Sequence, residues 1–200
     1  MSAVDTFPTS PKPRAISVTS VAPTYHSISH SLRQLTRSRG GQFWTVEMEF
    51  PPMTRSDFSP MWAFLVKQRG RYKSFNFVMP EHEPLGVATG TPTVNGVHSS
   101  GRAIQTQGWT TSVIDIMKSG DFLKFANHDK VYMMTSDANS NESGEAVLNI
   151  EPALQESLAN GEAVLATDIP FKMRFENDAS TTFVDRNLFY GWSCKIVEAL

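Results

Sequence analysis

The chain has 200 residues, with 18 Lys and Arg against 20 Asp and Glu, a formal net charge of −2 and 40% hydrophobic residues. This is the composition of an ordinary globular protein, and it lacks the surplus of cations with which nucleic-acid-binding proteins neutralise phosphates. No stretch approaches the roughly 18 apolar residues of a membrane helix, so we expect neither a membrane nor sequence-specific nucleic acid as a partner.

The N-terminal part is predicted to begin with an arm and continue as β-strands. Residues 1–14 contain three prolines among Ser and Thr, which predicts an extended arm that is either disordered or docked on a neighbour. The N-terminus lacks the apolar core of a signal peptide, so we expect synthesis in a cytoplasm. Alternation in AISVTSV (15–21) and QFWTVEMEF (42–50) predicts two strands. Between them, residues 28–42 are predicted as a further strand that reverses at Gly40–Gly41.

One amphipathic helix is predicted near residues 55–69. Thr54 and Ser56 are possible N-caps, Asp57 falls in the first turn, and Gly70 is placed as a stop. Apolar residues recur at helical spacing, which indicates packing on a sheet rather than a cofactor pocket; they are Phe58, Met61, Trp62, Leu65 and Val66. The next run, YKSFNFVMP (72–80), alternates as a strand that ends at Pro80.

Residues 80–110 are rich in Gly, Pro, Thr and Ser, which marks a crossing into a second unit. Three strands are predicted there, within 121–126, 130–137 and 145–152, followed by a short turn or helix near 152–162. The chain closes with strands, and the last one alternates Leu188, Tyr190, Trp192, Cys194 and Ile196. The fold class is therefore mainly β with one amphipathic helix.

The sequence offers no constellation typical of catalysis. His128 and Asp129 lie between two predicted strands, and with Asn127 they are predicted to form a hairpin tip. Cys194 is predicted as small core filler because its surroundings do not favour a thiolate. Phosphate-binding loops, dinucleotide fingerprints and nucleophile elbows are absent from the sequence. A dispersed Ser-His-Asp triad remains open, but we predict no enzyme, no catalytic residues and no cofactor.

Two patterns bear on metal binding, and neither predicts a metal site. His26 and His30 would share one face of a strand, so a weak surface site is conceivable. Residues 137–145 resemble a calcium loop, but Glu142 stands where glycine is required and Leu148 where a bidentate carboxylate belongs. We interpret this segment as a polar hairpin connection.

Two basic clusters are candidates for contact with a partner. The first comprises Arg33, Arg37 and Arg39, and the second, at the predicted helix end, comprises Lys67, Arg69, Arg71 and Lys73. Cations at a helix C-terminus complement its dipole, which explains part of the second cluster. Each cluster is either solvated surface or a match for an acidic face on a neighbouring subunit.

Several segments, in this order, are similar to a known family. They are GGQFWTVEMEFPPMT (40–54), the helix segment FSPMWAFLVKQRGRYKSFNFVMP (58–80), the β segment KSGDFLKFANHDKVYMMTSDANSNESGEAVLNIEPAL (118–154), and the closing strands. Together they resemble the distal tail (baseplate ring) proteins of tailed bacteriophages, over nearly the whole chain from Ala15.

The resemblance implies a structural virion protein, made in the cytoplasm of the host bacterium. Its subunits would form a ring, expected to be a hexamer, at the tail tip or baseplate. The ring would join the tail tube protein to the baseplate hub protein and to tail fibre or receptor-binding proteins. A β-sandwich or barrel-like ring domain is then expected from residues 15–84 and 166–200, with a small β-barrel-like domain inserted at 85–165.

A ring requires head-to-tail contacts between two different patches of each subunit. We therefore expect the N-terminal strands and Arg33, Arg37 and Arg39 to border a neighbour. Alternatives are a tail tube or tube-terminator subunit, and a carbohydrate-binding β module with Trp44, Trp109 and Trp192 as stacking platforms. A cell-wall hydrolase is a third, for which no carboxylate or Cys–His pair can be assigned.

Overall fold

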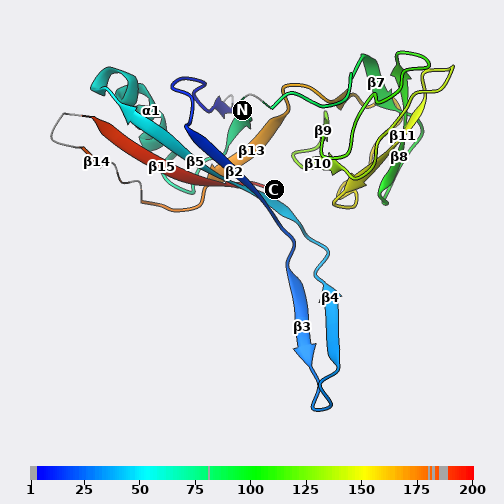
Figure 1. Ribbon diagram of the computed structural model, residues 1–200, viewed down its shortest axis with the longest axis horizontal. Helices are drawn as coiled ribbons and strands as arrows, with labels where there is room; N and C mark the ends of the chain where they lie inside the picture. The colour runs from blue at the N-terminus through cyan, green and yellow to red at the C-terminus, as the bar shows by residue number, and fades with distance from the viewer. Residues whose placement is uncertain (1–3, 81, 180, 182, 185–188) are drawn as a thin grey trace. The chain divides into compact units, whose positions relative to one another are not determined.

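A computed structural model describes residues 4–80, 82–179, 181, 183–184 and 189–200. The chain forms two compact units. Unit 1 comprises residues 1–76 and 172–199, and unit 2 comprises residues 77–171 with Leu200. The described residues are mainly strand with one α-helix (Figure 1), which confirms the predicted fold class.

Unit 1 is built on a seven-stranded sheet in the order β1-β6-β13-β15-β5-β2, with β14 also pairing β15. The strands are β1 (Asp5–Thr6), β2 (Ala15–Val21), β5 (Phe43–Met53), β6 (Phe75–Val78), β13 (Pro170–Phe175), β14 (Phe183–Val184) and β15 (Tyr190–Glu198). A separate two-stranded ribbon follows β2 and precedes β5 (Figure 1); it consists of β3 (Thr24–Ile28) and β4 (Gln34–Ser38).

The long strand β5, which lies between β15 and the edge strand β2, buries one face, as its alternation predicts. The buried side chains are Trp44, Val46, Met48 and Phe50, while Glu47 and Glu49 are exposed. In β15, Trp192 and Ile196 are also buried, and the ring of Trp192 stacks on Phe50 with centroids 4.9 Å apart. The predicted alternation there holds at these positions; Leu188 lies outside the described residues.

The helix α1 spans Arg55–Gln68, close to the predicted 55–69. Thr54 is the N-cap, and its hydroxyl oxygen accepts the backbone N–H of Asp57. At the other end Arg69 has a left-handed backbone (φ 55°), and its N–H donates to the carbonyl of Val66.

The buried side of α1 packs on the sheet, through a narrower stripe than predicted. Phe58, Met61 and Leu65 are buried, whereas Val66 is 60% exposed. The ring of Phe58 stacks on Tyr190 of β15, with centroids 5.0 Å apart. This contact places α1 against a sheet, as expected for an amphipathic helix.

The arm predicted for residues 1–14 contains a short strand that docks on its own unit. β1 pairs in parallel with β6, and the N–H of Phe7 donates to the carbonyl of Asn76 at 2.8 Å. The ring of Phe7 is buried against Phe64 and Phe75. A single aromatic anchor before the first proline therefore orders this segment, although its composition does not favour a regular element.

Unit 2 is a six-stranded sheet in the order β12-β9-β10-β11-β8-β7. Its strands are β7 (Gly90–Val94), β8 (Ala103–Trp109), β9 (Phe122–Phe125), β10 (Val131–Met134), β11 (Ala146–Glu151) and β12 (Val164–Leu165). The two outer strands approach each other, since Val94 N–H donates to the carbonyl of Glu162 at 2.8 Å and Gly161 N–H to that of Val94 at 2.9 Å. The sheet is therefore a nearly closed barrel around an apolar core.

Asp121 ties the loop before β7 to the barrel. Its side chain is buried, and its two carboxylate oxygens accept the backbone N–H groups of Leu85, Gly86 and Lys118 at 2.7, 3.0 and 2.8 Å. Three charge-assisted bonds compensate for burying the carboxylate. The sequence alone contains no signal for this role, because two of the three donors, Leu85 and Gly86, lie in a distant segment.

Replacing this carboxylate by an amide tests the role of Asp121. In Asp121→Asn the nitrogen cannot accept a hydrogen bond, so at least one buried N–H loses its acceptor. We expect the free energy of unfolding to fall by about 2–4 kcal/mol, measured by urea denaturation of the full chain, with faster hydrogen exchange at residues 85–88. The matched control Asp168→Asn, on an exposed side chain, is expected to change it by less than about 0.5 kcal/mol. Equal effects of the two variants would contradict the role.

Candidate functional site: the exposed hairpin

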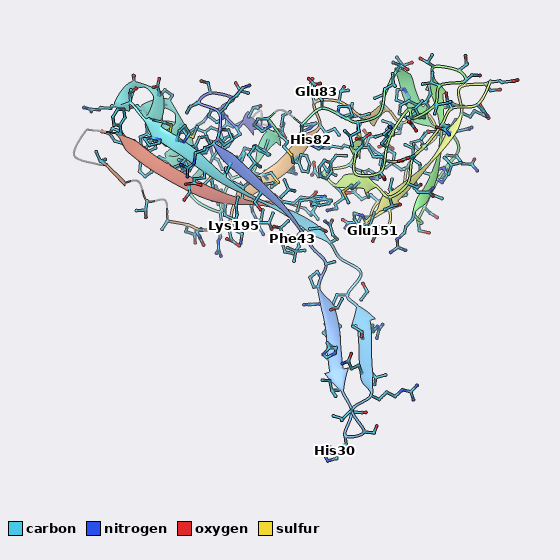
Figure 2. All side chains as sticks on the ribbon, viewed as in Figure 1. His30, Phe43, His82, Glu83, Glu151 and Lys195 are labelled. Carbon is cyan, nitrogen blue, oxygen red and sulfur yellow. The ribbon has the colours of Figure 1, made fainter. Side chains whose placement is uncertain are left out.

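The hairpin formed by β3 and β4 is the segment of unit 1 with the most exposed side chains. All ten of its strand residues are exposed. The two strands pair antiparallel, with Tyr25 opposite Arg37 and Ser27 opposite Leu35. Figure 2 shows His30 at the tip of the hairpin and Phe43 where β5 begins. The hairpin therefore presents side chains on both of its faces to solvent.

The chain reverses at residues 29–33, and the predicted reversal at Gly40–Gly41 is wrong. Ser29 holds the turn: its N–H donates to the carbonyl of Arg33, and its hydroxyl accepts the N–H of Arg33 at 3.1 Å. Leu32 has a left-handed backbone with φ 59°. The turn is held by a serine side chain that bonds the backbone of Arg33, and Leu32 takes the left-handed position where glycine is usual, which is why glycine spacing gave the wrong position.

The β2–β5 ladder continues into the hairpin without a reversal. Val21 pairs with Phe43 at the end of β2, and beyond it the N–H of Arg39 donates to the carbonyl of Pro23 at 3.1 Å. Gly40 has φ 81°, which a glycine adopts at little cost. The glycine pair thus marks an irregularity between β4 and β5.

The three candidate arginines lie on or beside β4. Arg37 is within the strand, Arg39 directly follows it, and Arg33 directly precedes it. The guanidinium carbon of Arg39 lies 5.0 Å from the centroid of the Tyr25 ring, a cation–π contact. Within the described part of the chain these arginines form no ion pair, so their charges are available to a partner.

Large apolar side chains accompany these charges, and sequence reasoning missed them. Tyr25, Ile28, Leu32 and Leu35 are between 55% and 83% exposed. Single exposed apolar residues are ordinary, but four within one short hairpin are typical of an interaction surface. If the turn at Ser29 had been recognised, residues 24–28 and 34–38 would have been predicted as two short strands with apolar side chains exposed on them.

The second basic cluster is partly engaged within unit 1. Lys67 Nζ lies 2.7 Å from the carboxylate of Asp5, and this hydrogen bond lowers the pKa of that carboxyl. The guanidinium of Arg71 donates to the carbonyl of Glu176, and its backbone N–H donates to Asp178 at 3.1 Å. These two cations hold unit 1 together and are less available to a partner than the hairpin arginines.

His128 belongs to a hairpin connection, as predicted. Strands β9 and β10 pair antiparallel on either side of it. Its side chain is 2% exposed, and Nδ1 lies 3.2 Å from the hydroxyl of Tyr132. A buried imidazole beside a tyrosine cannot reach a substrate in solvent, so the tip interpretation is confirmed.

The polar segment 137–145 uses its side chains to shape a loop. The side-chain oxygen of Asn141 accepts the N–H groups of Ser143 and Glu145 at 2.9 and 2.8 Å, and that of Asn139 accepts the N–H of Asp115 at 2.7 Å. The backbone N–H of Ser119 donates to Asp137 and lowers the pKa of that carboxyl. Within the described ranges no three His, Cys, Asp or Glu side chains gather as metal ligands, and His30 lies beyond the strand that holds His26.

The proposed sugar-stacking platforms are not accessible. Trp44, Trp109 and Trp192 are 4%, 3% and 5% exposed. Stacking on a sugar requires an exposed ring face, which these side chains do not offer. The carbohydrate-binding alternative therefore loses the residues on which it depended.

The chain consists of two β units, and the hairpin of unit 1 exposes all of its strand residues. These features are typical of a structural protein that contacts other subunits. No α-helix in the described part of the chain is long and apolar enough to cross a membrane. Residues 81–169 match the family model described as distal tail protein pb9, B domain. Over these residues the match confirms the resemblance to phage distal tail proteins, and it indicates a component of the virion tail. A comparison with curated proteins found no match.

The reactivity of Cys194 tests how strongly its thiol is buried in the sheet of unit 1. Its side chain is partly buried, and burial raises the pKa of its thiol to about 12. Because only the thiolate is nucleophilic, iodoacetamide near pH 8 should alkylate Cys194 roughly a thousandfold more slowly than a free cysteine of pKa about 8.5. The rate should still rise as the pH approaches 10. Mass spectrometry follows the modification, and protein unfolded in guanidinium is the control; rapid labelling of the folded protein would contradict the burial.

Proposed function

We propose that this protein is a structural virion protein that forms a ring, expected to be a hexamer, at the tail tip. In this role it joins the tail tube to the baseplate hub and fibres, without turnover. The observation that carries the proposal is the match of residues 81–169 to a domain of distal tail proteins. Its synthesis in the cytoplasm of the host bacterium follows from the same role.

Unit 1 supplies a free sheet edge for ring contacts in this proposal. β2 is the last strand of its sheet and pairs β5 along one side. Its seven residues, AISVTSV, include no charge and no proline, which are two of the devices by which natural edge strands avoid pairing. A neighbouring chain can extend the sheet there, which supports residues 15–84 and 166–200 as the ring-forming part and 85–165 as an inserted small domain.

The hairpin supplies the second contact. An isolated two-stranded hairpin is marginally stable in water, and a neighbouring subunit would cover the exposed apolar side chains of β3 and β4. Arg33, Arg37 and Arg39 then border that neighbour. The ring uses different patches on its two sides, as head-to-tail closure requires.

The oligomeric state tests the ring itself. The purified full chain should form six-subunit rings in negative-stain electron microscopy, with a matching mass by native mass spectrometry. Single-layer rings are expected from a tail-tip protein. Long stacked tubes would instead favour the alternative of a tail tube subunit, and a monomer at high concentration would contradict the ring.

Charge reversal on the hairpin tests its place in the ring. Because like charges across an interface cost several kcal/mol, Arg33→Glu with Arg37→Glu should lower the ring fraction at least about tenfold, which corresponds to about 1.4 kcal/mol. The monomer should melt at an unchanged temperature, since all strand residues of the hairpin are exposed. Arg55→Glu, an exposed position on α1, is the charge-matched control. Normal rings from the hairpin variant would remove the arginines from the interface.

A further inference from the structure

The net charge of the chain is close to zero, but its two units carry opposite net charges. In the sequence, unit 1 carries 14 Lys and Arg against 8 Asp and Glu, or +6, whereas residues 77–171 carry 4 against 12, or −8. The segregation is sharpest in two segments of equal length: residues 6–46 contain five cations and no acid, and residues 131–171 contain seven acids and no Lys or Arg. The first segment contains the hairpin. The second contains most of the described acidic surface of unit 2.

One face of the hairpin combines charge with apolar surface. Residues directly opposite in an antiparallel pair lie on the same face, and alternate residues share it. Tyr25 with Arg37, and Leu35 with Ser27, are such pairs, and Arg39 lies over the ring of Tyr25. We define Tyr25, Leu35, Arg37 and Arg39 as the Arg–Tyr face. The opposite face carries His26, Ile28, Gln34 and Thr36 and no permanent charge.

Unit 2 has a groove whose chemistry complements this face. Eight residues line it, and most of them are polar: Asn95, Gln105, Thr106, Asn139, Asn141, Glu145, Ala146 and Val147. Its volume of about 410 Å³ accommodates side chains, and Val147 is 50% exposed in it. We call it the amide groove. Glu142 and Glu145 belong to the loop beside it, and both are exposed.

Glu145, which lines the amide groove, and Glu142, which lies nearby in the same loop, have no cation beside them among the described residues. Glu145 accepts hydrogen bonds from the side-chain amides of Asn141 at 3.0 Å and, more weakly, Asn95 at 3.4 Å. Within the described residues neither Glu145 nor Glu142 forms an ion pair. A carboxylate with unused lone pairs is a partner for a guanidinium, which bonds two oxygens at once.

Other hollows of the chain fit the hairpin less well. The groove on the unit 1 sheet, about 570 Å³, is lined by Glu47 and Glu176, but Lys195 lies 3.2 and 3.3 Å from their carboxylates, so both acids already have a cation beside them. The cavity beside His82 and Phe122 has a volume of about 20 Å³, too small for an arginine side chain. Charge and size therefore both favour the amide groove.

We propose that the Arg–Tyr face of one subunit docks in the amide groove of the next copy of this chain. Arg37 and Arg39 pair with Glu142 and Glu145, while Tyr25 and Leu35 cover Val147. This inference rests on the proposed ring and names its partner surface. The contact is heterologous, because two different patches meet, and such a contact generates a ring when the rotation between copies closes.

Reciprocal charge reversal in two separate chains tests this contact. The hairpin variant carries Arg37→Glu and Arg39→Glu, and the groove variant carries Glu142→Arg and Glu145→Arg. Each alone should lower the ring fraction at least about tenfold, as read by native mass spectrometry, while the circular dichroism spectrum remains that of the folded wild type. In a one-to-one mixture every junction is complementary when the variants alternate, so rings should return with three copies of each.

Matched controls and alternative outcomes make the test decisive. Glu156→Arg adds the same kind of charge to unit 2 at an exposed position outside the groove, and it should assemble normally. Normal rings from the groove variant would overturn the contact and leave the proposed ring intact. Rescue in one chain carrying all four substitutions, without rescue in the mixture, would assign the contact to a single subunit and overturn the inference. If the wild type forms no ring, the proposed function and the contact both fail.

Discussion

The pairing of β5 with β15 on one side and β2 on the other is the constraint on which unit 1 depends. β5 contributes 11 residues to the sheet, and its alternate side chains from Trp44 to Phe50 are buried. The same ladder continues through Pro23 and Arg39 into the hairpin. A slip by one residue would turn Val46 and Met48 to solvent. The faces of the hairpin are set separately, by the pairing of β3 with β4.

The two units offer different means of contact to other subunits. Unit 1 has an open sheet edge at β2 and a hairpin with cations, so it can bind through both backbone and side chains. In unit 2 the approach of β12 and β7 leaves little open edge in the described sheet. Its contacts must then come from side chains and loops, where its acids are concentrated. A division of charge between units orients a heterologous contact, because only one arrangement brings opposite signs together.

Local features of the fold were predictable from sequence. The Thr54 cap, the stop near Gly70 and the alternation from Trp44 to Phe50 all depend on residues close together in the chain. The connection around His128 was recognisable for the same reason. Three features were not: the turn at Ser29, the docking of Phe7 and the bonds of Asp121. Each depends on a contact between a side chain and a backbone group or an aromatic ring, and the hydrophobic periodicity of the sequence does not predict such contacts.

The candidate site was only partly recognisable from the sequence. By itself the sequence determined a mainly β chain with one capped helix, no recognised catalytic motif, and a cation-only segment that includes Arg33, Arg37 and Arg39. Only the tertiary structure decided that the three tryptophans are buried, that Lys67 and Arg71 have partners within unit 1, and that Arg39 lies over Tyr25. The physical reason is range: periodicity and capping act over a few residues, whereas exposure and charge pairing depend on strand register between distant segments.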